Sequence, residues 1–141
     1  PENFYIHLID YTNTDIVEIE SATVDECQYN LEKESVTWIH VHGPIQDETN
    51  RRIGNTFELH PLALEDIFNK GKRPKIEEYD NLIFVIMTMP IQVNETTSVE
   101  QISIFLGKNY IISFHSGDKD PFDPLRSRLR KKIGKMEKIK I

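Results

Sequence analysis

The chain has 141 residues, of which 38% are hydrophobic and 28% charged, and this is the composition of an ordinary globular protein. The single cysteine, Cys27, excludes a disulfide framework and a cysteine-based zinc cluster. The net charge is −6, and residues 1–115 carry 8 Lys and Arg against 19 Asp and Glu, so we expect no nucleic-acid partner.

The first elements in chain order are a hairpin, a helix and a strand. Alternating hydrophobic residues on both sides of a polar turn predict a hairpin over about residues 4–19. Thr23, with Glu26 three residues later, predicts the start of a helix that runs to about Lys33. The β-branched and aromatic run over 36–42 predicts a central strand, in which we expect Trp38 to be buried with its indole N–H paired.

Two helices and a long strand follow. Residues 45–57 have a helical pattern, and His60-Pro61 opens a second helix with proline at its first position. On this second helix we expect Leu64, Ile67 and Phe68 to face inward. We interpret residues 72–75 as a connector and residues 79–92 as one long strand.

The last elements are a hairpin over 99–106 and 109–115 and a C-terminal helix from about Pro124. Hydrophobic residues recur along that helix at helical spacing without a terminating cap, which predicts the start of a longer helix that this chain truncates (Leu125, Leu129, Ile133 and Met136). The whole pattern predicts one α/β layered domain over residues 1–141, with a mixed β-sheet and helices on both faces.

Two groups of side chains could carry chemistry. Glu65 and Asp66 are adjacent on the second predicted helix and can both lie on its outer flank, where carboxylates suit a hard cation such as Mg²⁺. His40 and His42 share one face of the central strand and could chelate zinc, but such a site needs further ligands. Spacing alone favours the plainer interpretation in each case, namely a solvated acidic face and two polar residues at a sheet edge.

The stretch Phe57-Glu-Leu-His-Pro-Leu-Ala-Leu-Glu-Asp-Ile-Phe-Asn69, continued by Lys72-Arg-Pro-Lys-Ile-Glu-Glu-Tyr79, resembles the CorA family of magnesium and cobalt transporters. In that family a strand with tryptophan precedes a motif of this kind, and Trp38 occupies the strand here. Residues 100–115 look like the late hairpin of the family, and residues 123–130 look like the start of its next helix.

The resemblance implies the cytoplasmic, divalent-cation-sensing domain of a Mg²⁺/Co²⁺ channel of the cell membrane, and not an enzyme. Family members are homopentamers whose stalk helix leads to two transmembrane helices. Residues 125–141 would begin the stalk, and the membrane part is absent from this chain. We expect this chain by itself to form monomers or non-native dimers, because most of the family's pentamer contacts lie in the stalk and the pore.

The resemblance also assigns a regulatory metal site. Asp66 matches a ligand for a Mg²⁺ ion held between neighbouring subunits, and Glu65 matches a residue that contributes to a second ion. We expect weak binding of Mg²⁺ and, by family, of Co²⁺, with no ion held tightly by the isolated domain. Replacing Asp66 with Ala should then change the free energy of unfolding by less than ~0.5 kcal/mol, as for an ordinary surface residue.

Two alternatives stay open. A zinc transporter of the ZntB type belongs to the same superfamily, and its ion selectivity would be determined outside this chain. A metal-dependent hydrolase would instead use Glu65, Asp66, His40 and His42, and it requires all four side chains to converge in one cleft.

Overall fold

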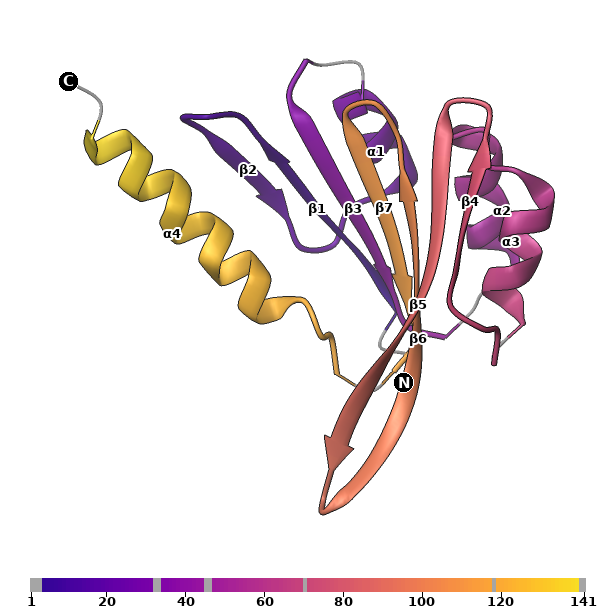
Figure 1. Cartoon of the computed structure of the whole chain (residues 1–141). Helices are drawn as coiled ribbons and strands as arrows, with labels where there is room; N and C mark the ends of the chain where they lie inside the picture. Colours follow the sequence, from indigo (N-terminus) through magenta and orange to yellow (C-terminus); the bar gives the residue numbers. More distant parts are fainter. Residues whose placement is uncertain (1–3, 32–33, 45–46, 70, 118, 140–141) are drawn as a thin grey trace.

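The computed structural model describes residues 4–31, 34–44, 47–69, 71–117 and 119–139, and they form one seven-stranded sheet with four helices (Figure 1). The strands are β1 (Tyr5–Tyr11), β2 (Ile16–Ile19), β3 (Val36–His42), β4 (Lys75–Tyr79), β5 (Leu82–Val93), β6 (Thr96–Leu106) and β7 (Tyr110–His115). The helices are α1 (Val24–Leu31), α2 (Asp47–Thr56), α3 (Pro61–Phe68) and α4 (Asp123–Ile139).

The sheet is mixed, with the strand order β2-β1-β3-β7-β6-β5-β4. Within the described strands, β3 and β7 form the single parallel pair, and the other neighbouring pairs are antiparallel. A parallel pair needs a long crossover, and here the crossover contains α2, α3 and three strands. The carboxyl ends of β3 and β7 therefore lie side by side, although the chain between them is long.

The two faces of the sheet differ in chemistry because side chains alternate along each strand. One face packs against α1, α2 and α3 through a hydrophobic core of aliphatic and aromatic residues, which includes Ile39, Val41, Ile53, Ala63, Phe84, Phe105 and Ile112. The opposite face carries Trp38, His40 and His42, and α4 begins over it with Arg126 stacked above the Trp38 ring. The prediction of a mixed sheet with helices on both faces is confirmed.

Local signals predicted most elements correctly. Thr23 and Glu26 form the reciprocal capping box, with Thr23 N–H donating to Glu26 Oε1 (2.9 Å) and Glu26 N–H donating to Thr23 Oγ1 (3.1 Å). Trp38 is buried, and its indole N–H donates to Ser113 Oγ at 3.0 Å, as predicted. The predicted ends of two helices at residues 32–33 and 45–46 lie outside the described residues.

The interpretation of residues 72–92 was wrong in two respects. Residues from Lys75 to Tyr79 form β4, although the sequence suggested a connector followed by a strand that began at Tyr79. A turn at Asp80, whose φ is 48°, then reverses the chain into β5. On α3, Ile67 is buried and Leu64 packs against the core, as predicted, whereas Phe68 is half-buried and Ala63, which was not predicted, is buried.

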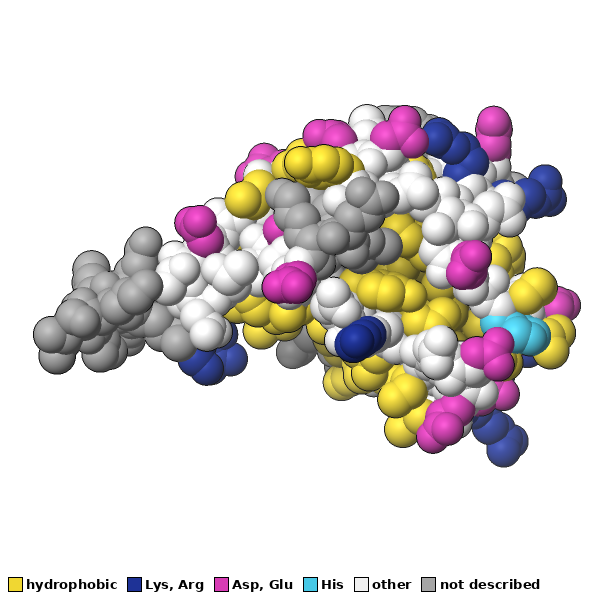
Figure 2. All heavy atoms as spheres, turned by 90° about the horizontal axis from the view of Figure 1, so that it is seen from above, with side chains coloured by type: hydrophobic (Ala, Val, Ile, Leu, Met, Phe, Trp, Pro, Cys, Tyr) yellow, Lys and Arg dark blue, Asp and Glu magenta, His cyan; other side chains and the backbone are white. Residues whose placement is uncertain are grey.

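The molecular surface agrees with the acidic composition. Figure 2 looks from above and shows acidic side chains spread over this end of the molecule, with Lys and Arg at separate points. The described part of this end has no continuous basic surface of the kind that binds nucleic acid. Among the described residues, no helix combines the length and the hydrophobic character needed to cross a bilayer.

Candidate functional site

Helix α3 positions the acidic pair that the sequence singled out. His60 is its N-cap residue, with an extended backbone, and its Nδ1 accepts a hydrogen bond from the Leu62 N–H at 3.1 Å. Pro61 follows at the first helical position, and Ala63 and Ile67 anchor the inner side of the helix in the core. Glu65 lies on the outer side of the helix, and its side chain is exposed.

Asp66 is paired with two lysines and is not freely solvated. Lys75 Nζ lies 2.5 Å from its Oδ2, and Lys72 Nζ lies 3.4 Å from its Oδ1. The Asp66 side chain is only 13% exposed. The hydrogen bond from Lys75 is the largest influence, and it holds the pKa of the Asp66 carboxyl below its usual value of 3.8. The expectation of an open outer flank is thus correct for Glu65 and wrong for Asp66.

The lysines reach Asp66 because the segment after α3 is attached to the sheet. Gln101 of β6 accepts a hydrogen bond from the Lys72 N–H at 3.1 Å and donates one to the Asp66 carbonyl at 3.4 Å. Lys75 also contacts Glu77 at 2.9 Å, so its ammonium group bridges two carboxylates. Sequence reasoning missed both lysines, although two basic residues soon after an acidic helix were a visible signal.

Glu65 and Asp66 thus form a pair of carboxylates in which Lys75 already compensates the charge of Asp66. A divalent cation at Asp66 would have to take the place of the Lys75 ammonium group, whereas Glu65 can offer its oxygens directly. Both groups are oxygen ligands, which Mg²⁺ prefers.

The histidine pair lies on the other side of the sheet. His40 and His42 are fully buried on the central strand and not at a sheet edge, so the expectation of an edge position was wrong. Burial lowers the pKa of His40 to about 3 and also lowers that of His42, which favours the neutral form of both rings. Their neighbours Ile39 and Val41 point to the core that contains α3, and the sheet therefore separates the histidines from Glu65 and Asp66.

Comparisons with known proteins show which family of sequences the chain resembles. A family model described as "CorA-like Mg2+ transporter protein" matches residues 33–140. The chain is 33% identical over 140 residues to the "Cobalt/magnesium transport protein CorA" of Thermotoga maritima, a match that covers 97% of this chain and 40% of that protein. It is also 33% identical over 92 residues to the "Putative metal ion transporter YfjQ" of Bacillus subtilis, a match that covers 65% of this chain and 28% of that protein. This chain thus spans less than half the length of these relatives.

Solved structures share the fold. The complete CorA magnesium transporter of Methanocaldococcus jannaschii aligns with a TM-score of 0.65 at 15% identity, over 97% of this chain and 39% of that chain. The soluble domain of the same CorA gives 0.63 at 16% identity, over 100% and 50%. The ZntB cytoplasmic domain of Vibrio parahaemolyticus gives 0.63 at 15% identity, over 95% and 51%. At these identities the likeness concerns the fold alone.

Proposed function

This chain belongs to the CorA-like Mg²⁺ transporter family, and we propose that it is the cytoplasmic, divalent-cation-sensing domain of a longer Mg²⁺/Co²⁺ transport protein. The observation that carries this proposal is the family match over residues 33–140. The relatives are named as transporters and not as enzymes. The hydrolase alternative loses its basis because the sheet separates its carboxylates from its histidines.

We place the regulatory site at Asp66, with Glu65 as a secondary ligand. The ion would bind between this surface of α3 and a neighbouring copy of the chain in a homopentamer. Few protein ligands and several retained waters make such a site weak, as is usual for Mg²⁺. In the single chain, without the ion, the Lys75 ammonium group compensates the negative charge of the Asp66 carboxylate. In the assembly, the bound ion would take over this role.

The coupling between ion and pore follows from electrostatics. Two facing carboxylates ~4 Å apart repel each other by ~4 kcal/mol at an effective dielectric constant of ~20. A bridging Mg²⁺ ion reverses the sign of that interaction and favours the closed assembly. Because the ion bridges only in the closed state, its loss at low magnesium shifts the population toward the open state.

Membrane attachment and assembly belong to the same proposal. The pore and the stalk would be supplied by parts of the protein outside residues 1–141, with residues 125–141 beginning the stalk. The ZntB-type alternative shares the fold, and carboxylate oxygens can bind Zn²⁺ as well as Mg²⁺.

The test uses the full-length protein in lipid vesicles. Limited proteolysis over a range of Mg²⁺ concentrations reports how well the ion protects the closed state. Asp66→Asn should raise the Mg²⁺ concentration needed for half-protection, and Glu65→Gln should raise it less. The matched control is Asp25→Asn, because the Asp25 side chain is 87% exposed on α1. Unchanged magnesium dependence in Asp66→Asn would overturn the assignment.

A further inference from the structure

A second cluster of metal-binding side chains lies on the face of the sheet that carries α4. The parallel pairing of β3 and β7 sets His40 opposite Ser113 and His42 opposite His115. Asp120, in the segment between β7 and α4, approaches the same place, with its Oδ2 3.7 Å from His40 Nε2. One ring nitrogen of His40, one of His42 and one Asp120 oxygen lie within 4.8 Å of one another.

Side chains outside the cluster hold the rings of His40 and His115 in place, as is usual for histidines that bind metals. His40 Nδ1 lies 2.6 Å from Ser113 Oγ, and His115 Nε2 lies 2.6 Å from Glu100 Oε1. Such outer partners fix the ring orientation and direct the other nitrogen toward an ion. The second nitrogen of His115, Nδ1, faces His42 Nδ1 at 3.4 Å.

One ring nitrogen of the cluster is buried without a hydrogen-bond partner among the described residues. His40 is 0% exposed, and its Nε2 makes no hydrogen bond within the described structure. A buried polar atom without a partner is unfavourable, and a bound metal ion would supply the missing partner of His40 Nε2. Zinc ligands lie ~2.0–2.1 Å from the ion, so tetrahedral ligand atoms are about 3.4 Å apart. The 3.7 Å separation of His40 Nε2 and Asp120 Oδ2 is close to that spacing.

We propose that His40, His42 and Asp120, with His115 adjacent, form a site for a divalent transition-metal ion of the Zn²⁺, Co²⁺ or Ni²⁺ class. Imidazole nitrogen favours these ions over Mg²⁺, which prefers oxygen. The site is independent of the proposed sensor at Asp66, from which the sheet separates it.

Arg126 would couple metal binding at this site to the position of helix α4. Its guanidinium is 1% exposed, and Nη1 lies 3.0 Å from the same Asp120 Oδ2 that faces His40. Tyr5 also donates to this oxygen, at 2.5 Å. Two cations repel each other at one carboxylate, so an incoming metal ion competes with Arg126. Arg126 belongs to α4, and metal occupancy therefore loosens the first turn of α4 from the sheet.

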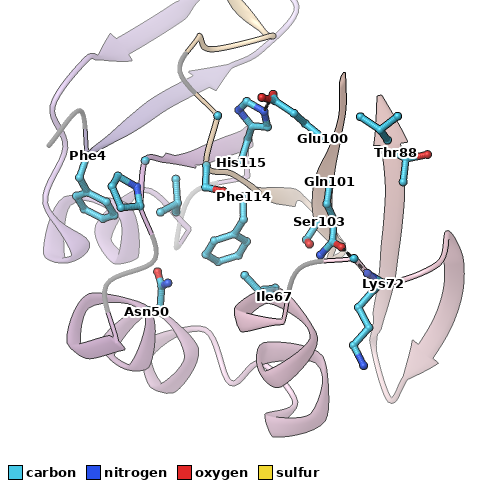
Figure 3. A pocket seen from close by; sticks show the side chains of 17 residues that line it. Phe4, Asn50, Ile67, Lys72, Thr88, Glu100, Gln101, Ser103, Phe114 and His115 are labelled. Carbon is cyan, nitrogen blue, oxygen red and sulfur yellow. Dashed lines mark hydrogen bonds and ion pairs between the residues drawn. The ribbon is translucent and has the colours of Figure 1, made fainter. Parts of the chain in front are cut away.

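A cavity lies beside His115, the histidine adjacent to the cluster. A cavity of about 250 Å³ opens at the carboxyl ends of β3 and β7, and Gly43, Gly117, Glu100 and His115 are among its lining residues. Figure 3 shows the Glu100 carboxylate and the His115 ring meeting at the wall of this cavity. His115 lines this cavity, and its Nδ1 lies 3.4 Å from His42 Nδ1.

The test is titration of the 141-residue chain with Co²⁺, followed by its visible absorption, and with Zn²⁺ by calorimetry. We expect saturable binding of one ion, weakened about tenfold or more in His42→Gln and in His40→Gln. Arg126→Gln should bind more tightly than the unmodified chain. The matched controls are His60→Asn, which keeps the helix cap, and Asp66→Asn, which alters only the other proposed site. Neither control should change the affinity.

Two outcomes overturn the proposal: no saturable binding, or binding that His42→Gln leaves unchanged. Weaker binding in Arg126→Gln overturns the competition with α4. Circular dichroism checks that each variant is folded. If His40→Gln fails to fold, long-range ¹H–¹⁵N spectra of the unmodified chain decide the matter, because Zn²⁺ should shift the Nε2 resonance of His40 and leave that of His60 in place. An unmoved His40 resonance contradicts the site.

Discussion

At the scale of single residues, Trp38 shows how the central strand is held. Its indole N–H donates to Ser113 on the neighbouring strand, and its ring meets the edge of Phe122 at a centroid distance of 5.3 Å. Arg126 lies over the same ring at 5.1 Å. One side chain thus joins β3, β7 and the segment that starts α4. The Phe122 and Arg126 side chains of that segment cover the Trp38 ring.

We expect Trp38→Ala to lower the free energy of unfolding by ~3–5 kcal/mol, because it leaves a cavity and removes these contacts. Urea denaturation measures the change. Trp38→Phe is the control, since it keeps most of the buried ring and should cost less. A loss below ~1 kcal/mol for the alanine variant would contradict a central role of the strand.

Asp66 also behaves differently from the surface residue that the sequence suggested. Because it is paired with Lys75 and mostly covered, we expect Asp66→Ala to cost ~0.5–1 kcal/mol, above the limit expected from the sequence. A double-mutant cycle of Asp66→Asn and Lys75→Gln should show a favourable coupling of about 0.5 kcal/mol. Lys72→Gln is the comparison, because Lys72 is farther away and its coupling should be smaller. A coupling of zero with Lys75 would mean that the pair does not persist in solution.

At the scale of elements, one ion pair connects α4 to the edge of the sheet. The Arg130 guanidinium on α4 contacts the Glu18 carboxylate on β2, and His7 lies 2.5 Å from the same carboxylate. The hydrogen bond from Arg130 is the largest influence on Glu18, and against the opposing effect of burial it lowers the pKa of that carboxyl to about 2. The orientation of α4 on its face of the sheet therefore depends partly on charge.

This pair predicts a pH dependence with a definite sign. The folded pKa of Glu18 is below its usual value of 4.5, so its stabilisation is present above about pH 4.5 and is lost as the pH falls toward 2. Since the Arg130 side chain is 43% exposed, solvent screening limits the contribution to about 1 kcal/mol. Glu18→Gln should therefore be less stable than the unmodified chain at neutral pH and equally stable near pH 2, by urea unfolding. If Glu18→Gln lowered the free energy of unfolding by the same amount at both pH values, the ion pair would not be the cause.

The β5–β6 hairpin extends beyond the rest of the sheet in Figure 1, and its turn is strained. Asn94 and Glu95 both have positive φ, 52° and 58°, which is the backbone of a type I′ turn. Glycine suits the second position of that turn, so Glu95→Gly should stabilise the chain by about 0.5 kcal/mol in thermal unfolding. Glu95→Ala is the control and should give no gain. Destabilisation by glycine would mean that the turn has a different conformation in solution.

At the scale of the whole molecule, exposed hydrophobic residues are mostly dispersed, with one small group on the sheet. Val17, Tyr29, Leu62, Val99 and Leu125 lie on different elements, whereas Ile76, Ile83 and Met87 share one face of β4 and β5. Single exposed hydrophobic residues are common on monomers, whereas stable interfaces need larger continuous patches. A group of three residues is small for a stable interface, so the assembly proposed for the full-length protein would depend mainly on contacts outside residues 1–141.

We therefore expect the 141-residue chain to sediment as a monomer or a weak dimer over a range of concentrations. Analytical ultracentrifugation measures this, with the full-length protein as the comparison. A pentamer formed by this chain alone would contradict the view that the stalk and pore supply the main contacts.

The sequence by itself determined the order of most elements, the capping of α1 and α3 and the family motif, because all of these depend on neighbouring residues. It missed the turns at Asp80 and Asn94-Glu95, because neither carries the glycine that usually marks positive φ. Only the tertiary structure decided which side chains meet. Asp66 is compensated by Lys75 from the next strand, and His40 faces Ser113, which is 73 residues away in the chain. Such partners leave no local pattern, because the parallel pairing of β3 with β7 brings together segments whose sequences do not depend on each other.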